Sequence, residues 1–102
     1  MAEFEQVASV SQVPPGSLLT VEVAGNAVLI ANVDGKFYAM EATCGHEEWD
    51  LSEGRLDGFK VVCAGHGAIW DLRTGAAEFD EPLKARRLYE VKAEGGLLFV
   101  KK

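Results

Sequence analysis

Two short motifs contain every cysteine and every histidine of this 102-residue chain. Cys44 precedes His46 by two positions, and Cys63 precedes His66 by three. Thiolate sulfur and imidazole nitrogen are ligands that soft and borderline transition metals prefer in proteins. Structural residues scattered by chance would seldom fall into two such pairs. The spacing therefore predicts that these four side chains bind one metal centre.

Two kinds of metal centre use this set of ligands. A tetrahedral zinc ion would take two thiolates and two imidazoles, but zinc fingers usually have a cysteine pair followed by a histidine pair. In a two-iron, two-sulfide cluster, one iron can take both cysteines and the other both histidines. The order Cys-His, Cys-His would let each motif give one ligand to each iron. The order therefore favours the iron–sulfur cluster, with zinc as the alternative.

The residues between and after the two motifs make the pattern more specific. Residues 51–58 (LSEGRLDG) lie between the motifs, and Gly67 follows the second histidine. A Trp-Asp pair at 70–71 and a Thr-Gly pair at 74–75 come next. This arrangement resembles the Rieske-type ferredoxins, and the resemblance extends over residues 28–100, most of the chain.

The resemblance implies how the ligands divide between the irons. Cys44 and Cys63 would hold one iron of a [2Fe-2S] cluster, and His46 and His66 would hold the other. The chain also departs from the family pattern in two ways. Many relatives have proline directly after the second cysteine, where this chain has Ala64. High-potential relatives have two further cysteines that form a disulfide between the cluster loops, and this chain has only the two predicted ligands.

The rest of the sequence predicts an all-β fold of short antiparallel strands. Apolar and β-branched residues form short segments that turn residues separate. The expected strands are residues 4–8, 18–23, 27–33, 36–40, 59–62, 68–72, 88–92 and 97–101. Asp34-Gly35 is a strong signal for a two-residue hairpin, because glycine tolerates the positive φ of a type I′ turn. No segment keeps a helical period beyond about eight residues.

The length and the glycines indicate how this fold would hold the metal. At 102 residues the chain is expected to form one domain, residues 1–102. We expect residues 41–82 to form a small cluster-binding subdomain inserted into a Rieske-like antiparallel sandwich or barrel. Glycine lets the backbone approach cluster sulfurs without a Cβ clash. The glycines in this insert include Gly54, Gly58, Gly65, Gly67 and Gly75.

Composition narrows the class of partner. The net charge of −6 argues against nucleic acid, whose phosphates would repel the chain, and favours a partner with a basic patch.

The amino-terminal segment lacks the basic and apolar regions of a secretory signal. No apolar run approaches the roughly 20 residues that span a bilayer. We therefore expect a cytoplasmic protein with no membrane segment.

Two positions after the second motif bear on the reduction potential. By the resemblance, Ala68 and Trp70 stand where high-potential relatives have a serine and a tyrosine whose hydroxyls bond to cluster sulfurs. Neither side chain has a hydroxyl, so the electron-rich reduced state would lose that stabilisation. The potential is expected near the low end of the roughly −150 to +300 mV range of histidine-ligated clusters. Trp70 is otherwise expected to lie in the core.

Three other groups lie near the predicted site in the sequence. Residues 47–49 (Glu-Glu-Trp) follow the first motif and could form either a docking surface beside the histidines or a solvated acidic face. Pro82 resembles the third loop that shields the cluster in the family. Arg86 and Arg87 are expected on a solvated face.

The resemblance implies a one-electron carrier and not an enzyme. The cluster would have no open coordination position, so this chain alone would have little means of transforming a substrate. Similar ferredoxins of bacterial aromatic-ring oxygenase systems take electrons from a flavin reductase and deliver them to a terminal oxygenase, which makes such redox proteins the expected partners. A small Rieske subunit of a nitrite-reductase-like complex is the alternative within this class. A structural zinc-binding module is the alternative from a different class.

Overall fold

The computed structural model describes residues 4–42, 51–63, 68–78 and 86–101, which form an all-β structure as predicted. The strands in these ranges are β1 (Phe4–Ser9), β2 (Leu18–Val23), β3 (Asn26–Val33), β4 (Lys36–Glu41), β5 (Arg55–Asp57), β6 (Lys60–Val62), β7 (Ile69–Asp71), β8 (Ala77–Glu78), β9 (Leu88–Tyr89), β10 (Val91–Glu94) and β11 (Leu97–Lys101). Two single turns of 3-10 helix are η1 (Val10–Gln12) and η2 (Leu51–Glu53). No helix within these ranges is long and apolar enough to cross a membrane.

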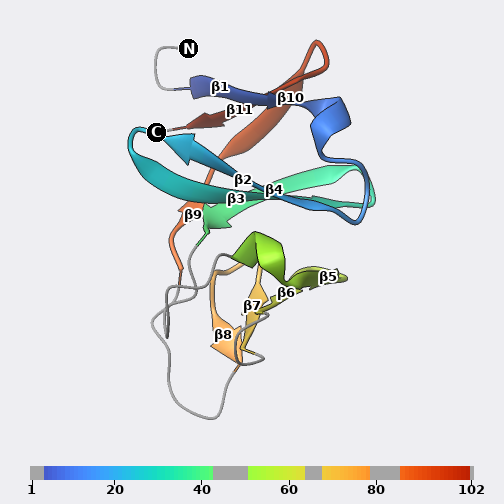
Figure 1. Cartoon of the computed structure of the whole chain (residues 1–102), viewed down its shortest axis with the longest axis vertical. Coiled ribbons are helices and arrows are strands. Elements are labelled where there is room, and N and C mark those ends of the chain that lie inside the picture. The colour runs from blue at the N-terminus through green and yellow to red at the C-terminus, as the bar shows by residue number, and fades with distance from the viewer. Residues whose placement is uncertain (1–3, 43–50, 64–67, 79–85, 102) are drawn as a thin grey trace.

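The strands form three antiparallel sheets stacked along the long axis of the molecule (Figure 1). The first sheet has the order β1-β11-β10, the second β2-β3-β4-β9 and the third β5-β6-β7-β8. The second sheet lies in the middle, between the first sheet at the top of Figure 1 and the third sheet below it. It therefore needs apolar side chains on both of its faces.

Strand β3 provides these two apolar faces. Residues 28–33 are all buried, and a strand covered on both sides requires such a continuous run. Val28 and Ile30 pack into the first core, which lies between the first and second sheets. Leu29 and Ala31 point the other way into the second core, between the second and third sheets. The alternation of one strand thus serves two separate cores.

The predicted hairpin at Asp34-Gly35 is confirmed. Both residues have positive φ, 53° for Asp34 and 92° for Gly35, as a type I′ turn requires. The buried side chain of Asn32 supports the turn, because its Oδ1 accepts a hydrogen bond from the Gly35 amide at 2.7 Å. Its Nδ2 donates to the carbonyl oxygen of Val13, also at 2.7 Å, so both polar atoms of this buried amide are satisfied.

The strand expected over residues 88–92 is divided between two sheets. Leu88 and Tyr89 form β9, which pairs with β4 at the edge of the second sheet. Val91–Glu94 form β10, which pairs with β11 in the first sheet. The prediction of one continuous strand was therefore wrong. An alternating pattern indicates which side chains face a core, but it does not identify the neighbouring strand.

The third sheet is the smallest, with strands of two or three residues. Strands β6 and β7 lie within the predicted segments 59–62 and 68–72. Strands β5 and β8 had not been predicted, because two or three residues are too few to show a period. One face of this sheet packs against the second sheet and carries the part of the metal motif that the structure describes.

Candidate metal centre

Cys63 is the one predicted ligand that lies within the described residues. It follows β6 directly and is only 2% exposed. The other three predicted ligands, Cys44, His46 and His66, lie outside the described residues, as do residues 47–49, Ala64 and Pro82. The geometry of the site is therefore built from Cys63 and from the residues at the ends of the motif segments.

The second motif is flanked by two paired strands. Val61 lies opposite Trp70 in the register of β6 and β7. Beyond the strands the pairing continues, because the Cys63 amide donates to the carbonyl oxygen of Ala68 at 2.8 Å. The residues on either side of segment 64–67 are thus held together by a hydrogen bond. This bond fixes the backbone at Cys63 within the third sheet.

The residues on either side of the first motif meet in the second core. The amide of Leu51 donates to the carbonyl oxygen of Ala42 at 2.6 Å, which brings together the two ends of residues 43–50. Ala42 and Leu51 are both fully buried, and they belong to the same second core as Cys63. The fold therefore joins the flanks of both motifs in one core, although the motifs are separate in sequence.

A glycine lets the turn after η2 approach the second motif. A Cβ at Gly54 would overlap the carbonyl oxygen of Val62, the residue before Cys63. The Gly54 amide also donates to the Leu51 carbonyl oxygen at 3.1 Å, which closes the 3-10 turn. Glycine thus allows close approach of two backbone segments here, while the predicted approach of glycines to cluster sulfurs stays a prediction.

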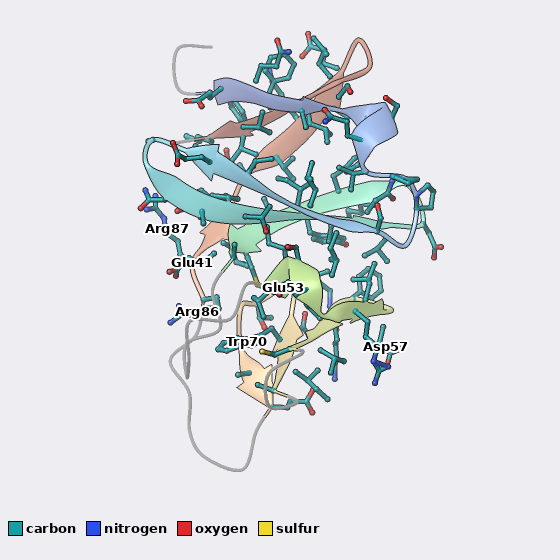
Figure 2. The ribbon with its side chains drawn as sticks, in the orientation of Figure 1. Glu41, Glu53, Asp57, Trp70, Arg86 and Arg87 are labelled. Carbon is teal, nitrogen blue, oxygen red and sulfur yellow. The ribbon has the colours of Figure 1, made fainter. Side chains whose placement is uncertain are left out.

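Beside this turn lies an open depression of about 260 Å³. Its lining residues are Glu53, Gly54, Arg55, Val62 and Cys63. Figure 2 shows Glu53 at η2, between the second and third sheets. The buried cysteine thus lies next to an opening with charged residues on its wall.

The predicted core position of Trp70 is confirmed. Trp70 is fully buried. Its Nε1 and the Nε of Arg86 are buried and have no hydrogen-bond partner among the residues that the structure describes. Buried donors are normally paired, so two such groups, one of them in the same core as Cys63, agree with an electron-rich bound group. Together with the thiol and imidazole content of the motifs, these residues fit an iron–sulfur cluster.

A second glycine fixes the entry to and the exit from the segment that contains Pro82. Gly75 has φ of 78°, and a Cβ there would overlap the carbonyl oxygen of Arg86. The Arg86 amide donates to the Gly75 carbonyl oxygen at 2.8 Å. The two flanks of residues 76–85 are therefore in direct backbone contact.

The prediction of a solvated face at Arg86 and Arg87 was right for one residue only. Arg87 is exposed, but only 11% of the Arg86 side chain is accessible. Arg86 lies against Glu41 and Trp70, and Figure 2 shows Glu41 and Arg86 at one side of the molecule with Trp70 in the third sheet. Two adjacent arginines gave no sequence signal that one of them would be buried. The only hint was the alternation of sides along an extended chain.

The Trp-Asp and Thr-Gly pairs of the motif form the turn after β7. The carbonyl oxygen of Asp71 accepts from the amide of Gly75 at 2.7 Å. Its carboxylate accepts from the Arg73 amide at 2.8 Å and from the Arg73 guanidinium at 3.1 and 3.2 Å. These hydrogen bonds from Arg73 hold the pKa of Asp71 below its ordinary value. The turn is thus stabilised by a charged pair outside the core.

Comparison with known proteins identifies the class of this fold and site. The family model for the Rieske [2Fe-2S] domain matches residues 3–92, so the chain belongs to this family. It carries a [2Fe-2S] cluster, and the zinc alternative is thereby set aside. A chain in the structure described as "Complex of reduced oxygenase and oxidized ferredoxin in carbazole 1,9a-dioxygenase" is similar, with a TM-score of 0.88 and 30% identity over 97% of this chain and 93% of that one.

Curated relatives narrow the class to electron-transfer components. The chain is 41% identical over 93 residues to the biphenyl dioxygenase ferredoxin subunit of Pseudomonas sp. (strain KKS102), covering 90% of this chain and 85% of that protein. It is 37% identical to the ferredoxin component of the p-cumate 2,3-dioxygenase system of Pseudomonas putida, covering 98% and 86%. The chain is accordingly an electron carrier of the ferredoxin type and not a catalytic subunit.

Proposed function

We propose that this chain is the ferredoxin of a multicomponent aromatic-ring dioxygenase system in the cytoplasm. It takes one electron at a time from a flavin reductase and delivers it to a terminal oxygenase. The observation that supports this most strongly is similarity over nearly the whole length to ferredoxin components named for such systems. The nitrite-reductase-like alternative has no comparable support, because these relatives are all named for dioxygenases.

The four motif residues are the proposed ligands. Cys44 and Cys63 bind one iron, and His46 and His66 bind the other. The hydrogen bonds between the flanks of each motif support this assignment, because both sets of flanking residues belong to one core. Residues 41–82 make up the proposed cluster-binding subdomain. When bound, the cluster accepts and returns one electron.

The chain's own residues supply an apolar wall on one side of the site. Ala68 and Trp70, beside the second motif, are fully buried, and Cys63 is almost so. Apolar packing excludes water on this side, so little solvent has to reorganise when charge arrives at the site. The methyl group of Ala68 offers no hydrogen bond to sulfur, which supports a reduction potential at the low end of the range for this class.

Charge supports a partner with a basic docking surface. The chain has sixteen acidic and ten basic residues and a net charge of −6. Long-range attraction to a basic patch raises the rate of productive encounters, and this attraction weakens as salt increases. Both the reductase and the oxygenase are expected to present such a patch. Electron transfer between the purified proteins should therefore slow with increasing ionic strength.

Reconstitution of the electron-transfer chain tests the proposal. The holo-protein is mixed with a flavin reductase and a terminal oxygenase that co-purify with it or are encoded nearby, and NADH-dependent product formation is measured. Product is expected only when all three proteins are present, and stopped-flow absorbance should show reoxidation of the reduced ferredoxin by the oxygenase. Full turnover without this chain would contradict the proposed role. His66→Ala, which is expected to lack the cluster, is the redox-inactive control and should support no product formation.

A further inference from the structure

Arg86 differs from the other arginines within the described residues. Arg55, Arg73 and Arg87 are exposed, whereas the Arg86 side chain is 11% accessible. An isolated cation is costly to bury unless charges, dipoles or aromatic rings compensate for the lost water. A largely buried arginine therefore requires a structural or an electrostatic reason.

Two groups compensate in part for the water that the Arg86 guanidinium has lost. Its Nη1 lies 3.4 Å from Oε2 of Glu41, and its Cζ lies 5.5 Å from the centre of the Trp70 ring. The other carboxylate oxygen of Glu41 accepts from the backbone amide of Arg87 at 2.6 Å. Glu41 is 35% accessible, so water screens its charge more than that of Arg86. The guanidinium of Arg86 is therefore screened by water less than the carboxylate that faces it.

The three residues of this cluster come from three flanks of the site. Glu41 ends β4 and lies two residues before segment 43–50, which contains the first motif. Trp70 lies on β7, after segment 64–67, and Arg86 comes directly after segment 79–85. Figure 2 shows Glu41 and Arg86 on one side of the molecule, with Trp70 next to Arg86 in the third sheet. The contacts of Arg86 thus link residues that flank all three segments.

Strand register places this cluster in line with Cys63. Trp70 lies opposite Val61, and Cys63 is two positions further along the same strand face as Val61. Diagonal neighbours of this kind are about 7–8 Å apart across an antiparallel pair, within reach of an aromatic side chain. Trp70 and Cys63 belong to the same buried core. Arg86 thus contacts Trp70, and Trp70 shares its buried core with Cys63.

We propose that Arg86 is a positioning residue that raises the reduction potential of the cluster. This inference rests on the proposed role of Cys63 as an iron ligand. With neutral imidazoles the oxidised site has no net charge, and reduction adds one negative charge. A buried cation stabilises the reduced state more than the oxidised one, and the low dielectric preserves this effect over the distance between them. Contact with Trp70 also holds β7 and the second motif in place.

The direct test compares two adjacent arginines by protein-film voltammetry. Arg86→Gln and Arg87→Gln change the net charge equally, but one removes a buried cation and the other an exposed one. Arg86→Gln should lower the potential several-fold more than Arg87→Gln. The difference should persist at about 1 M salt, where the Debye length is about 3 Å. Arg86→Lys keeps the charge, so its reduction potential should stay close to that of the wild type.

A second pair of variants covers the case in which Arg86→Gln fails to assemble the cluster. The Glu41–Arg86 pair is partly buried, and removing both members of such a pair leaves no unpaired charge, so it is tolerated better than removing one. The double variant Glu41→Gln/Arg86→Gln should therefore fold, and its potential should lie below that of Glu41→Gln alone. Equal potentials in that pair, or equal shifts for Arg86→Gln and Arg87→Gln, would overturn the inference. These potentials are read from the cluster itself, so they are independent of whether an oxygenase is the true partner.

Discussion

The two cores of this protein lie between strands of different lengths. The first core lies between β1, β10 and β11 on one side and the second sheet on the other, and the strands around it are mostly four to eight residues long. The third sheet has strands of two or three residues, and the second core depends on the opposite face of β3 and β4. Strands this short do not form a stable sheet alone. The comparison suggests that apolar packing is sufficient for the first two sheets, whereas the third sheet needs the metal as well.

Metal binding and folding are therefore expected to be coupled on one side of the molecule. The flanks of the predicted ligand segments are joined by hydrogen bonds from the Leu51 amide to the Ala42 carbonyl oxygen and from the Cys63 amide to the Ala68 carbonyl oxygen. A metal centre that links those segments adds its binding free energy to the stability of that region. The first core has no predicted ligand. Five sets of variants test this difference and the site that it supports, ordered from the largest expected effect to the smallest.

Loss of a histidine ligand should have the largest effect. His46→Ala and His66→Ala are each expected to abolish the Rieske cluster, because one iron loses half of its protein ligands. Amides of β5–β8 should lose hydrogen-exchange protection, while those of β3 keep theirs. Iron and sulfide analysis, EPR and hydrogen exchange measure these outcomes. An unchanged EPR spectrum in either variant would refute the ligand assignment.

Adjacent residues of β3 face different cores, so substitutions there test each core separately. Leu29 and Ile30 are both fully buried, but Leu29 packs into the second core and Ile30 into the first. Leu29→Ala and Ile30→Ala should each lower the free energy of unfolding by about 2–5 kcal/mol, from lost burial and the cavity left behind. Only Leu29→Ala should also reduce cluster content per folded chain. Denaturant unfolding and iron analysis give the two quantities, and equal cluster loss in both variants would remove the distinction.

Gly75→Ala tests the backbone contact beside the third segment. Gly75 has positive φ, and a Cβ there would overlap the Arg86 carbonyl oxygen, so the variant carries strain and a clash. Gly58 also has positive φ, but no atom lies within 4 Å of its Cβ position. Gly58→Ala should therefore cost about 1 kcal/mol of unfolding free energy from strain alone, and Gly75→Ala clearly more. Equal losses in thermal unfolding would show that the contact with Arg86 does not matter.

Ala68→Ser should raise the reduction potential without a large change in stability. Ala68 is fully buried beside Cys63, so a hydroxyl there could donate to cluster sulfur. A net gain of about 1 kcal/mol from one hydrogen bond corresponds to about 40 mV for a one-electron couple. Ala93→Ser, on the exposed side of β10 in the first sheet, is the matched control and should leave the potential unchanged. Voltammetry that finds no rise for Ala68→Ser would argue against hydroxyl tuning.

The smallest effect is expected from the charged turn after β7. The hydrogen bonds from Arg73 lower the pKa of Asp71, so the carboxylate contributes stability at neutral pH. This contribution should be lost as pH falls below the ordinary aspartate value of about 3.9. Wild type should therefore exceed Asp71→Asn in unfolding free energy at pH 7, and the two should converge in acid. A difference that stays constant down to pH 2 would indicate that charge is not its origin.

Local patterns predicted the elements better than their partners. The segment 18–23 was predicted with the bounds of β2, and Asp34-Gly35 was predicted as the hairpin that it forms. The division of residues 88–92 between two sheets depends on tertiary pairing, which an alternating pattern does not encode. The ligand assignment remains a prediction from spacing and resemblance.

The part of the site beyond the motifs required the structure. The burial of Arg86 depends on Glu41 and Trp70, which are distant in sequence. The hydrogen bond between Leu51 and Ala42 likewise could not be predicted from the sequence. Residue type and spacing therefore predicted which atoms could bind the metal, but not which side chains surround it.

A redox titration of the purified protein, monitored by EPR and combined with metal analysis, tests the central claim most directly. The predicted result is two irons and two acid-labile sulfides per chain, with a rhombic signal that appears on uptake of one electron. Protein that is correctly folded but contains zinc, or that takes up no electron, would contradict the assignment.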